Sequence, residues 1–317
     1  MIIDSHIHVF DRRVAGAAEN FPLWPGNEWG GDEDSLLRQM DEAGIERAFL
    51  ISYTPVDVMA HYPPERRDHM VAVFQHYLRR DYFVEVWQRH TDRLYWFADS
   101  IDPRVPGYVE RAAQDLDQGA AGLKLLPLFV DTEMGDERWR PIFELLRAHR
   151  KPCIIDLSWW YADQPHFAPS VYGLYDSFTD YVAGFGRLLA DFPDLRIQLA
   201  HYGTPRLVDR ADGNIHYDRL DEVIAFMNRF PSLRCDLGAY QHLISREEPY
   251  PFESALRVVE LLVAGIGANR IHWGTDWPYL RFKPYTDLLR AIREAPFLDA
   301  AQVDLILGAN ALQFMEG

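Results

Sequence analysis

The 317-residue chain has only two cysteines, and no apolar run approaches the roughly 18 residues that span a bilayer. Cys153 and Cys235 each lie inside a short apolar run, which excludes a disulfide framework and predicts buried, reduced thiols. The sequence does not open with a basic segment followed by an apolar stretch, so no secretory signal peptide is expected. These absences predict a cytoplasmic protein that does not bind a membrane.

Positive charge is also scarce, because 32 Lys and Arg residues stand against 48 Asp and Glu residues, for a formal net charge of -16. Such an acidic chain is not expected to bind nucleic acid or anionic membrane surfaces. Hydrophobic residues make up 48% of the sequence and charged residues 25%, as in a globular protein with a substantial core. The expected partner is a small-molecule substrate, since a cleft can be locally positive on an acidic protein.

Short apolar runs alternate with longer amphipathic runs along the whole chain, without a linker or a compositional break. Eight strand–helix units over about 300 residues favour an α/β fold, a single-domain (β/α)8 TIM barrel covering residues 1–317. A doubly wound open sheet is the alternative, but the glycine-rich phosphate turn that usually follows its first strand is absent. The predicted strands are Ile2–Val9, Arg47–Tyr53, Leu94–Ser100, Gly122–Leu126, Cys153–Leu157, Arg196–His201, Leu233–Leu237 and Ile271–Thr275.

Amphipathic runs between these strands predict the helices of the barrel. Asp32 or Asp34 is the candidate N-cap of the first helix. The predicted helices are Asp34–Ala43, Arg66–His90, Gly107–Gln118, Glu137–His149, Tyr181–Ala190, Asp218–Phe230, Glu253–Ala264 and Tyr285–Glu294, followed by a final apolar run over Val303–Phe314.

The most informative motif is the pair His6 and His8 in the first predicted strand. Because side chains alternate along a strand, Asp4, His6 and His8 are predicted to share one face. Two imidazoles two residues apart on one face can bind a single metal ion. The alternative is an edge strand that holds two histidines by chance, and the remaining strands help to decide between the two.

Polar residues also occupy the ends of later strands, where a barrel places its active site. Lys124 lies in the fourth strand, Asp156 ends the fifth, and His201 and Asp276 end the sixth and the eighth. Singly, such residues more often cap a helix, fill the core or pair with a buried acid. The ordered set of all of them predicts an active site.

These motifs resemble the amidohydrolase superfamily, in particular its amidohydrolase-related branch of lactonases and amino-carboxymuconate-semialdehyde decarboxylase-like enzymes. The resemblance implies that His6, His8 and Asp276 bind one divalent metal ion, with Zn expected and Mn or Fe as alternatives. It also implies that His201 orients or deprotonates the attacking water, so that His201 and Asp276 are the catalytic residues. The matching segments are Asp-Ser-His-Ile-His at 4–8, Gly-Leu-Lys-Leu at 122–125, Leu-Ala-His-Tyr-Gly at 199–203, Trp-Gly-Thr-Asp-Trp-Pro at 273–278 and Leu-Gly-Ala-Asn-Ala at 307–311.

The fifth strand departs from this family pattern, because Asp156 stands where a metal-binding histidine is usual. In the favoured interpretation Asp156 is itself a metal ligand. Two alternatives stay open: His166 in the following segment replaces it, or the site binds metal weakly or not at all, as resemblance to the pyrone-dicarboxylate lactonases allows. Lys124 is expected to contact substrate or a neighbouring acid at a site with a single metal ion.

The implied reaction is hydrolysis of a small lactone, ester or amide, cyclic or carboxylated, by a metal-activated water. Non-oxidative decarboxylation of an unsaturated or aromatic acid is the first alternative, although decarboxylase-like members often have Glu in place of the first histidine of the pair. A metal-independent lactonase or a non-catalytic barrel is the second.

Four residues besides Lys124 are candidates for substrate binding. An aromatic loop insertion over about 158–177 contains Trp159 and Trp160, which are predicted to form a stacking wall, or alternatively to pack the loop or a subunit contact. Arg104 and Arg206 follow the third and sixth strands and are predicted to pair with a substrate carboxylate, although surface ion pairs are their alternative role. A homodimer is compatible with the resemblance, but no sequence feature locates its interface.

Overall fold

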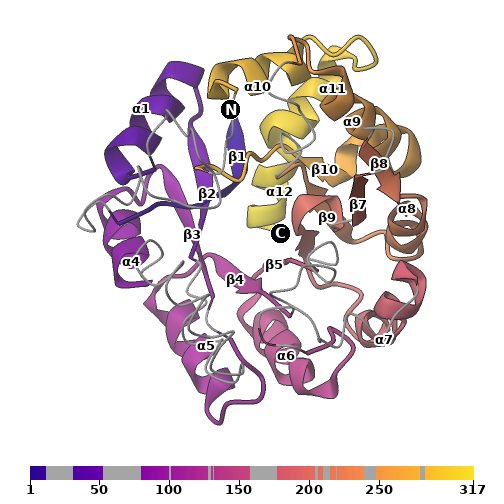
Figure 1. Ribbon diagram of the computed structural model, residues 1–317. Coiled ribbons are helices and arrows are strands. Elements are labelled where there is room, and N and C mark those ends of the chain that lie inside the picture. The colour runs from indigo at the N-terminus through magenta and orange to yellow at the C-terminus, as the bar shows by residue number, and fades with distance from the viewer. Residues whose placement is uncertain are drawn as a thin grey trace.

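Eight parallel strands form a ring at the centre of the computed structural model, and helices surround it (Figure 1). The structure describes residues 1–11, 31–52, 80–99, 101–127, 130, 132–157, 177–203, 206–209, 215–218, 220–238, 248–278 and 283–317. Neighbouring strands of the ring are paired in the order β1 (Ile3–Ile7), β2 (Arg47–Ile51), β3 (Leu94–Ala98), β4 (Gly122–Leu125), β5 (Cys153–Ile155), β6 (Ile197–Leu199), β9 (Leu233–Asp236) and β10 (Ile271–His272).

The ring is closed by backbone hydrogen bonds between β1 and the segment that begins at β10. Ser5 N donates to Trp273 O at 2.9 Å, and His8 N donates to Trp277 O at 2.6 Å. A parallel bridge also pairs Ile7, the last residue of β1, with Trp277. The predicted (β/α)8 barrel is therefore confirmed, and each of its eight strands falls inside a predicted range.

The helices follow the strands as predicted, with small shifts at their ends. The Asp32 side chain accepts a hydrogen bond from Ser35 N, which confirms it as the N-cap of the first helix. The predicted helix over Arg66–His90 is described only over its last part. The helices are α1 (Glu33–Ala43), α4 (Arg80–Arg89), α5 (Tyr108–Gln118), α6 (Arg140–His149), α7 (Phe178–Ala190), α8 (Leu220–Arg229), α9 (Glu253–Ile266), α10 (Tyr285–Arg293), α11 (Ala300–Asp304) and α12 (Asn310–Glu316), with a π-helical turn over Leu305–Ala309 between the last two.

A hairpin within the described part of the chain was not predicted. A two-stranded antiparallel hairpin, β7 (Arg206–Asp209) and β8 (Ile215–Asp218), lies between β6 and α8. The predicted helix over Asp218–Phe230 is wrong at its first residue, because Asp218 ends β8. Strands of four residues are too short to show a clear alternation in the sequence.

Residues of the barrel strands face two separate hydrophobic layers. The outer layer lies between strands and helices and includes Leu50, Trp96 and Leu123. The inner layer fills one end of the barrel, where Phe314 of α12 packs on Phe49 with ring centroids 6.3 Å apart. Figure 1 shows α12 near the centre of the ring. With apolar side chains at that end, the polar side chains of the interior lie at the C-terminal ends of the strands.

A cleft of about 660 Å³ opens at the N-terminal ends of the strands, on the side of the barrel opposite to those polar side chains. Its lining mixes charges of both signs, since it includes Arg147, Arg150, Lys151 and Arg196 together with Asp194 and Glu316. In (β/α)8 enzymes this end of the barrel serves stability, whereas the chemistry takes place at the other end.

Both cysteines are buried and unpaired, as predicted. Burial raises the pKa of both the Cys153 and the Cys235 thiols, so neither is a reactive thiolate. In the described part of the chain, no helix is both long enough and apolar enough to cross a bilayer.

Glu33 ties the start of α1 to the end of α4. Its carboxylate accepts hydrogen bonds from Arg89 Nε at 2.9 Å and pairs with His90 Nε2 at 2.7 Å. Burial alone would raise the pKa of Glu33, but the bonds to Arg89 and His90 hold it below its usual value.

Because the pKa of Glu33 is depressed in the folded state, its stabilisation is present above the unfolded value of 4.5 and is lost as the pH falls through the folded value. We therefore expect Glu33→Gln to lower the free energy of unfolding by about 1 kcal/mol at pH 7. Urea denaturation of the wild type and of Glu33→Gln, at pH 7 and in acid, should show that the difference in free energy of unfolding disappears in acid. An equal difference at pH 7 and in acid would contradict the ion-pair explanation.

Candidate metal centre

A register shift in β1 directs the two histidines into the barrel. Asp4 and Ile7 are three residues apart, yet the residues opposite them in β2 are only two apart. Both of those β2 residues, like Ile7, belong to the outer hydrophobic layer, so Asp4 and Ile7 point outward while His6 and His8 point inward. The prediction that Asp4 shares a face with the histidines is wrong, because the extra residue in β1 changes the alternation between them.

Both imidazoles are held by their Nδ1 atoms and present Nε2 to the same carboxylate. His6 Nδ1 lies 3.0 Å from Asp236 Oδ2, and His8 Nδ1 lies 2.8 Å from the carbonyl oxygen of Ile51. On the other side of the rings, Asp276 Oδ1 is 3.2 Å from His8 Nε2 and 3.8 Å from His6 Nε2. Since a carbonyl oxygen only accepts, His8 Nδ1 must donate, and in the neutral imidazole this leaves the lone pair on Nε2, where a metal ion would bind.

These three atoms fit the coordination of a divalent metal ion. Ligand atoms about 2.0–2.1 Å from a tetrahedral zinc ion are roughly 3.4 Å apart, and the two distances above lie on either side of that value. Burial, reinforced by the charge of Lys124, lowers the pKa of His6 well below its usual value, so the ring is neutral as a metal ligand must be. The group His6, His8 and Asp276 is therefore a candidate metal centre.

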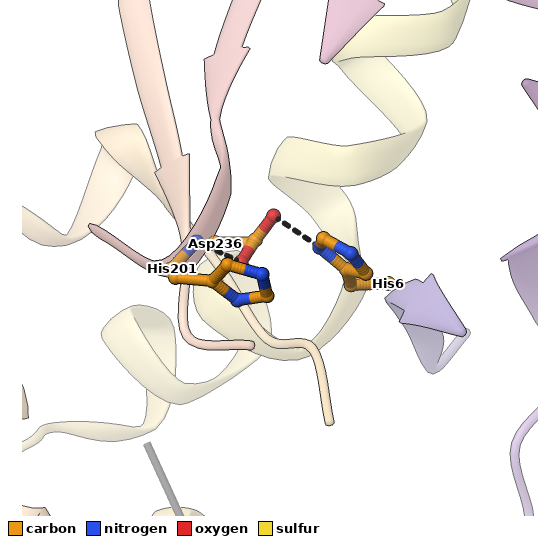
Figure 2. A group of neighbouring side chains, drawn as sticks. All are labelled: His6, His201 and Asp236. Atoms are coloured by element: carbon orange, nitrogen blue, oxygen red, sulfur yellow. Dashed lines mark hydrogen bonds and ion pairs between the residues drawn. The ribbon is translucent and has the colours of Figure 1, made fainter. Parts of the chain in front are cut away.

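A second group, His6, His201 and Asp236, also brings three potential ligands together (Figure 2). Here, however, both carboxylate oxygens already accept hydrogen bonds from within the group: Asp236 Oδ1 from the backbone N of His201 at 2.8 Å, and Oδ2 from His6 Nδ1. The first group is the better candidate, because both of its histidines turn their Nε2 atoms towards the same Asp276 oxygen, whereas the second group uses His6 Nδ1 and both Asp236 oxygens to hold side chains and backbone in place.

The backbone around Asp276 is strained and firmly held. Asp276 has a φ of 60°, in the left-handed region that non-glycine residues rarely adopt. Its N donates to His6 O at 2.8 Å, and the preceding Thr275 N donates to Asp4 Oδ1 at 3.1 Å. Strain of this kind persists where the surroundings fix it, and it commonly marks a functional site. Here it keeps the Asp276 carboxylate directed at the two histidines.

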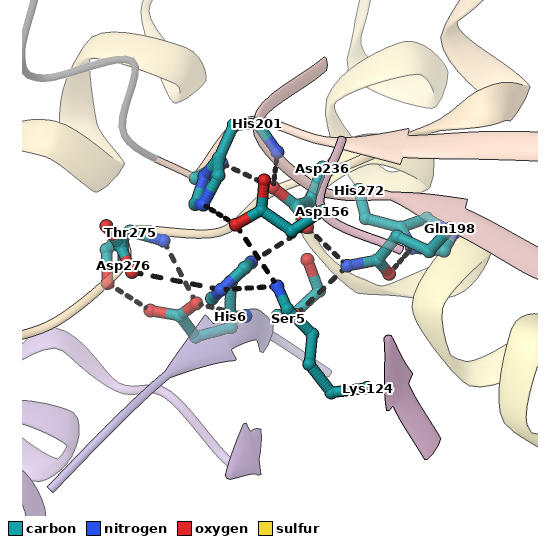
Figure 3. Close-up of polar contacts among 12 residues, drawn as sticks. Ser5, His6, Lys124, Asp156, Gln198, His201, Asp236, His272, Thr275 and Asp276 are labelled. Atoms are coloured by element: carbon teal, nitrogen blue, oxygen red, sulfur yellow. Dashed lines mark hydrogen bonds and ion pairs between the residues drawn. The ribbon is translucent and has the colours of Figure 1, made fainter. Parts of the chain in front are cut away.

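On the other flank of the centre, Asp156 lies between a lysine and a third histidine (Figure 3). Its Oδ2 is 3.6 Å from His201 Nε2 and 3.9 Å from Lys124 Nζ, and Lys124 Nζ lies 3.5 Å from His6 Nε2. The His201 ring stacks on His6 with centroids 4.6 Å apart. Burial disfavours a charged His201, but Asp156 outweighs it and raises the pKa of His201 to about 9. Burial lowers the pKa of Lys124, against the effect of Asp156.

The family model described as "Amidohydrolase" matches residues 3–315. The chain belongs to the amidohydrolase family. This confirms the predicted family and the prediction of an enzyme, and it accounts for the order of the motifs along the chain. No curated protein matches the sequence.

Solved structures show that the fold of this amidohydrolase extends over whole chains. A probable 2-pyrone-4,6-dicarboxylic acid hydrolase from Acinetobacter baumannii, with citric acid bound, is 14% identical with a TM-score of 0.65, covering 100% of this chain and 99% of that one. An amidohydrolase from Burkholderia multivorans with bound zinc is 17% identical, with the same TM-score and coverage. The 5-carboxyvanillate decarboxylase of Sphingomonas paucimobilis is also 17% identical, with a TM-score of 0.62 over 99% and 98% of the two chains.

The structure brings together five of the predicted site residues of the amidohydrolase and leaves a sixth beside them. His6, His8, Lys124, His201 and Asp276 all contact one another or share a partner at the C-terminal end of the barrel. Asp156 adjoins them, but neither group of potential metal ligands among the described residues contains its carboxylate. Its role as a ligand stays a prediction.

Apart from Lys124, the predicted substrate-binding residues lie elsewhere or outside the described residues. Arg104 forms a two-pronged ion pair with Asp102, with both N–O distances at 3.0 Å, so its own loop holds it. Arg206 is not in a loop but is the first residue of β7, and its side chain lies outside the described part of the structure. Trp159 and Trp160 also fall outside the described residues, as do His166 and nearly all of the predicted insertion.

Three buried polar residues of the amidohydrolase site were not predicted. Asp236 ends β9, while Gln198 and His272 lie within β6 and β10, and all three are fully buried. The available signal was a polar residue in an otherwise apolar barrel strand. It was hard to use, because a polar residue near a strand end is more often a cap or turn residue.

Proposed function

We propose that this amidohydrolase hydrolyses a small lactone, ester or amide, cyclic or carboxylated, with the help of one divalent metal ion. The convergence of His6 Nε2, His8 Nε2 and Asp276 Oδ1 is the observation that supports this proposal. Two histidines and one carboxylate leave coordination positions open for water and substrate, as catalytic zinc sites do. Zn is the expected ion, and Mn or Fe suits the same ligand set. The bound zinc of the Burkholderia multivorans relative agrees with this choice.

The residues of this chain supply positioning and proton transfer. A divalent ion held by His6, His8 and Asp276 would lower the pKa of a water molecule and would polarise a carbonyl oxygen. Asp276 is placed to accept the proton of the attacking water and to return it to the leaving group. His201, stacked on His6 and backed by Asp156, is placed to align the water or to stabilise negative charge that develops on oxygen. The buried ammonium of Lys124 offers a partner for a substrate carboxylate.

Decarboxylation is the second candidate, and the position of Lys124 favours it. A buried cation 3.5 Å from a metal-ligand nitrogen can hold a substrate carboxylate next to the metal, which suits loss of CO2 as well as hydrolysis. A 5-carboxyvanillate decarboxylase and a 2,6-dihydroxybenzoate decarboxylase are among the similar structures, each with a TM-score of 0.62.

The two reactions are separated by their products. The metal-loaded protein should be incubated with lactones, esters, amides and carboxylated aromatic acids, while the hydroxy acid or amine and the CO2 formed are measured. We expect hydrolysis products from cyclic substrates. Release of CO2 alone would replace hydrolysis by decarboxylation. Turnover without any metal uptake would support a metal-independent lactonase, and the absence of both would support a non-catalytic barrel.

The metal centre has three or four protein ligands, depending on whether Asp156 binds the metal ion. Because its carboxylate lies against Lys124 and His201, we expect Asp156→Ala to keep about one equivalent of metal, with an affinity close to that of the wild type. Elemental analysis and chelator competition on the wild type and the variant test this, with His8→Ala as the control that should lose the metal. Loss of metal from Asp156→Ala would instead establish Asp156 as a fourth ligand, as the sequence predicts.

A further inference from the structure

We propose that His272, Gln198 and Asp236 form a hydrogen-bonded relay that fixes the tautomer of His6 and so sets how tightly the amidohydrolase holds its metal ion. The relay depends on the metal site of the proposed function, but its three members are not part of the ligand set. They are positioning residues that act through His6, and they extend from its Nδ1 atom into the barrel interior (Figure 3).

The acidic member of the relay is saturated with donors. Asp236 Oδ1 accepts from the backbone N of His201 and of Gly238, both at 2.8 Å, and Oδ2 accepts from Gln198 Nε2 at 2.5 Å. His6 Nδ1 is the fourth contact, at 3.0 Å from Oδ2. An ionised carboxylate only accepts hydrogen bonds, so the proton of this bond belongs to His6 Nδ1. The Nε2 of His6 therefore carries the lone pair that a metal ion would bind, and it faces Asp276 and Lys124 Nζ.

The amide of Gln198 has one orientation in this arrangement. Its Nε2 lies 3.2 Å from Ser5 O in addition to Asp236 Oδ2, and both of these atoms only accept. The other end, Oε1, must then accept from His272 Nδ1, 2.6 Å away. Burial lowers the pKa of His272 to about 3, which keeps the ring neutral, and its Nε2 has no hydrogen-bond partner among the described residues. His272 thus fixes Gln198, and Gln198 fixes Asp236.

The three members of the relay and His6 come from four different barrel strands: His272 from β10, Gln198 from β6, Asp236 from β9 and His6 from β1. Each is at most 1% exposed, so water is not available to replace a lost partner. The backbone also packs closely on Asp236 at Gly238, where an added Cβ would be 2.7 Å from Asp236 Oδ1. Loss of the carboxylate would leave the orientation and tautomer of His6 undetermined.

Partners of this kind orient a metal-binding histidine and make it a stronger ligand, and their removal typically weakens metal binding 10–100-fold. We therefore expect Asp236→Asn to raise the Kd for Zn²⁺ by about 10–100-fold. An amide at this place has to point its two hydrogens at groups that are themselves donors. Gln198→Met, which interrupts the relay one step further away, is expected to have a smaller effect of a few-fold.

The experiment measures Zn²⁺ affinity by chelator competition, the absorption spectrum of the Co²⁺-loaded protein, and urea unfolding of each metal-free variant. Asp115→Asn is the matched control, because it removes a buried carboxylate that pairs with Arg80 away from the site. We expect that control to change unfolding but neither the Zn²⁺ affinity nor the Co²⁺ spectrum. Asp236→Asn and Gln198→Met should change the affinity, and Asp236→Asn should also change the spectrum.

The outcomes separate this inference from the proposed function. Wild-type Zn²⁺ affinity and an unaltered Co²⁺ spectrum in folded Asp236→Asn would overturn the relay while leaving the metal site in place. If Asp236→Asn does not fold, Gln198→Met takes over the test, and unchanged affinity in that variant overturns the relay. A wild type that takes up neither Zn²⁺ nor Mn²⁺ would overturn both the relay and the metal-dependent function.

Discussion

Asp276→Asn is expected to lower turnover by about 10³-fold or more while the barrel stays folded. Asp276 Oδ1 is the one carboxylate oxygen in the group formed with His6 and His8, and the same residue is the proposed proton acceptor. An amide of the same shape keeps the packing but provides neither an anionic ligand nor a base. The measurement is kcat on the best substrate from the screen, together with the metal content of the purified variant.

The metal content shows which role of Asp276 dominates. If the variant keeps its metal but loses turnover, proton transfer is the main contribution, and if both are lost, ligation is. Asp304→Asn, which changes an exposed carboxylate in α11, is the control and should keep wild-type turnover. Full activity in Asp276→Asn would contradict the proposed mechanism. His6→Ala should lose turnover in the same way, since it removes a ligand from the same group.

The eight barrel strands could be predicted because each is a short apolar run between breakers or amphipathic segments. Their C-terminal limits could not. The last predicted strand, Ile271–Thr275, ends at His272 because Trp273 N turns away from the ladder and donates to Ile306 O at 2.8 Å. The side chains beyond His272 remain buried and are apolar or hydrogen-bonded. The strand-like pattern in the sequence therefore continues past the point where the hydrogen bonds between β10 and β9 end.

The residues of the candidate metal centre could be predicted because they belong to short local motifs. The contact between His6 and Asp236 could not, since 230 residues separate its two members and closure of the barrel brings them together. The face of Asp4 could not be predicted either, because strict alternation holds only where the strand has no register shift. A local pattern therefore indicates the candidate ligands, while the supporting hydrogen bonds depend on tertiary structure.

Asp4 is the second residue whose removal should have a large effect, here on stability. It is fully buried, and its carboxylate accepts hydrogen bonds from His6 N, Thr275 N, Thr275 Oγ1 and the Tyr285 hydroxyl. Burial raises the pKa of Asp4 to about 7 against the effect of these bonds, so the carboxylate itself is costly to bury. The loss on removal comes instead from the donors, which would be left without an acceptor.

Asp4→Ala is therefore expected to lower the free energy of unfolding by about 3 kcal/mol or more, measured by urea denaturation. Tyr285→Phe removes only one of the donors and should cost about 1 kcal/mol. An equal loss in both variants would show that the backbone donors find other partners. Because Asp4 also holds Thr275, the neighbour of Asp276, we expect Asp4→Ala to weaken metal binding too, whereas Tyr285→Phe should leave it unchanged. The network that closes the barrel at β1 would then also be the one that positions the metal ligand.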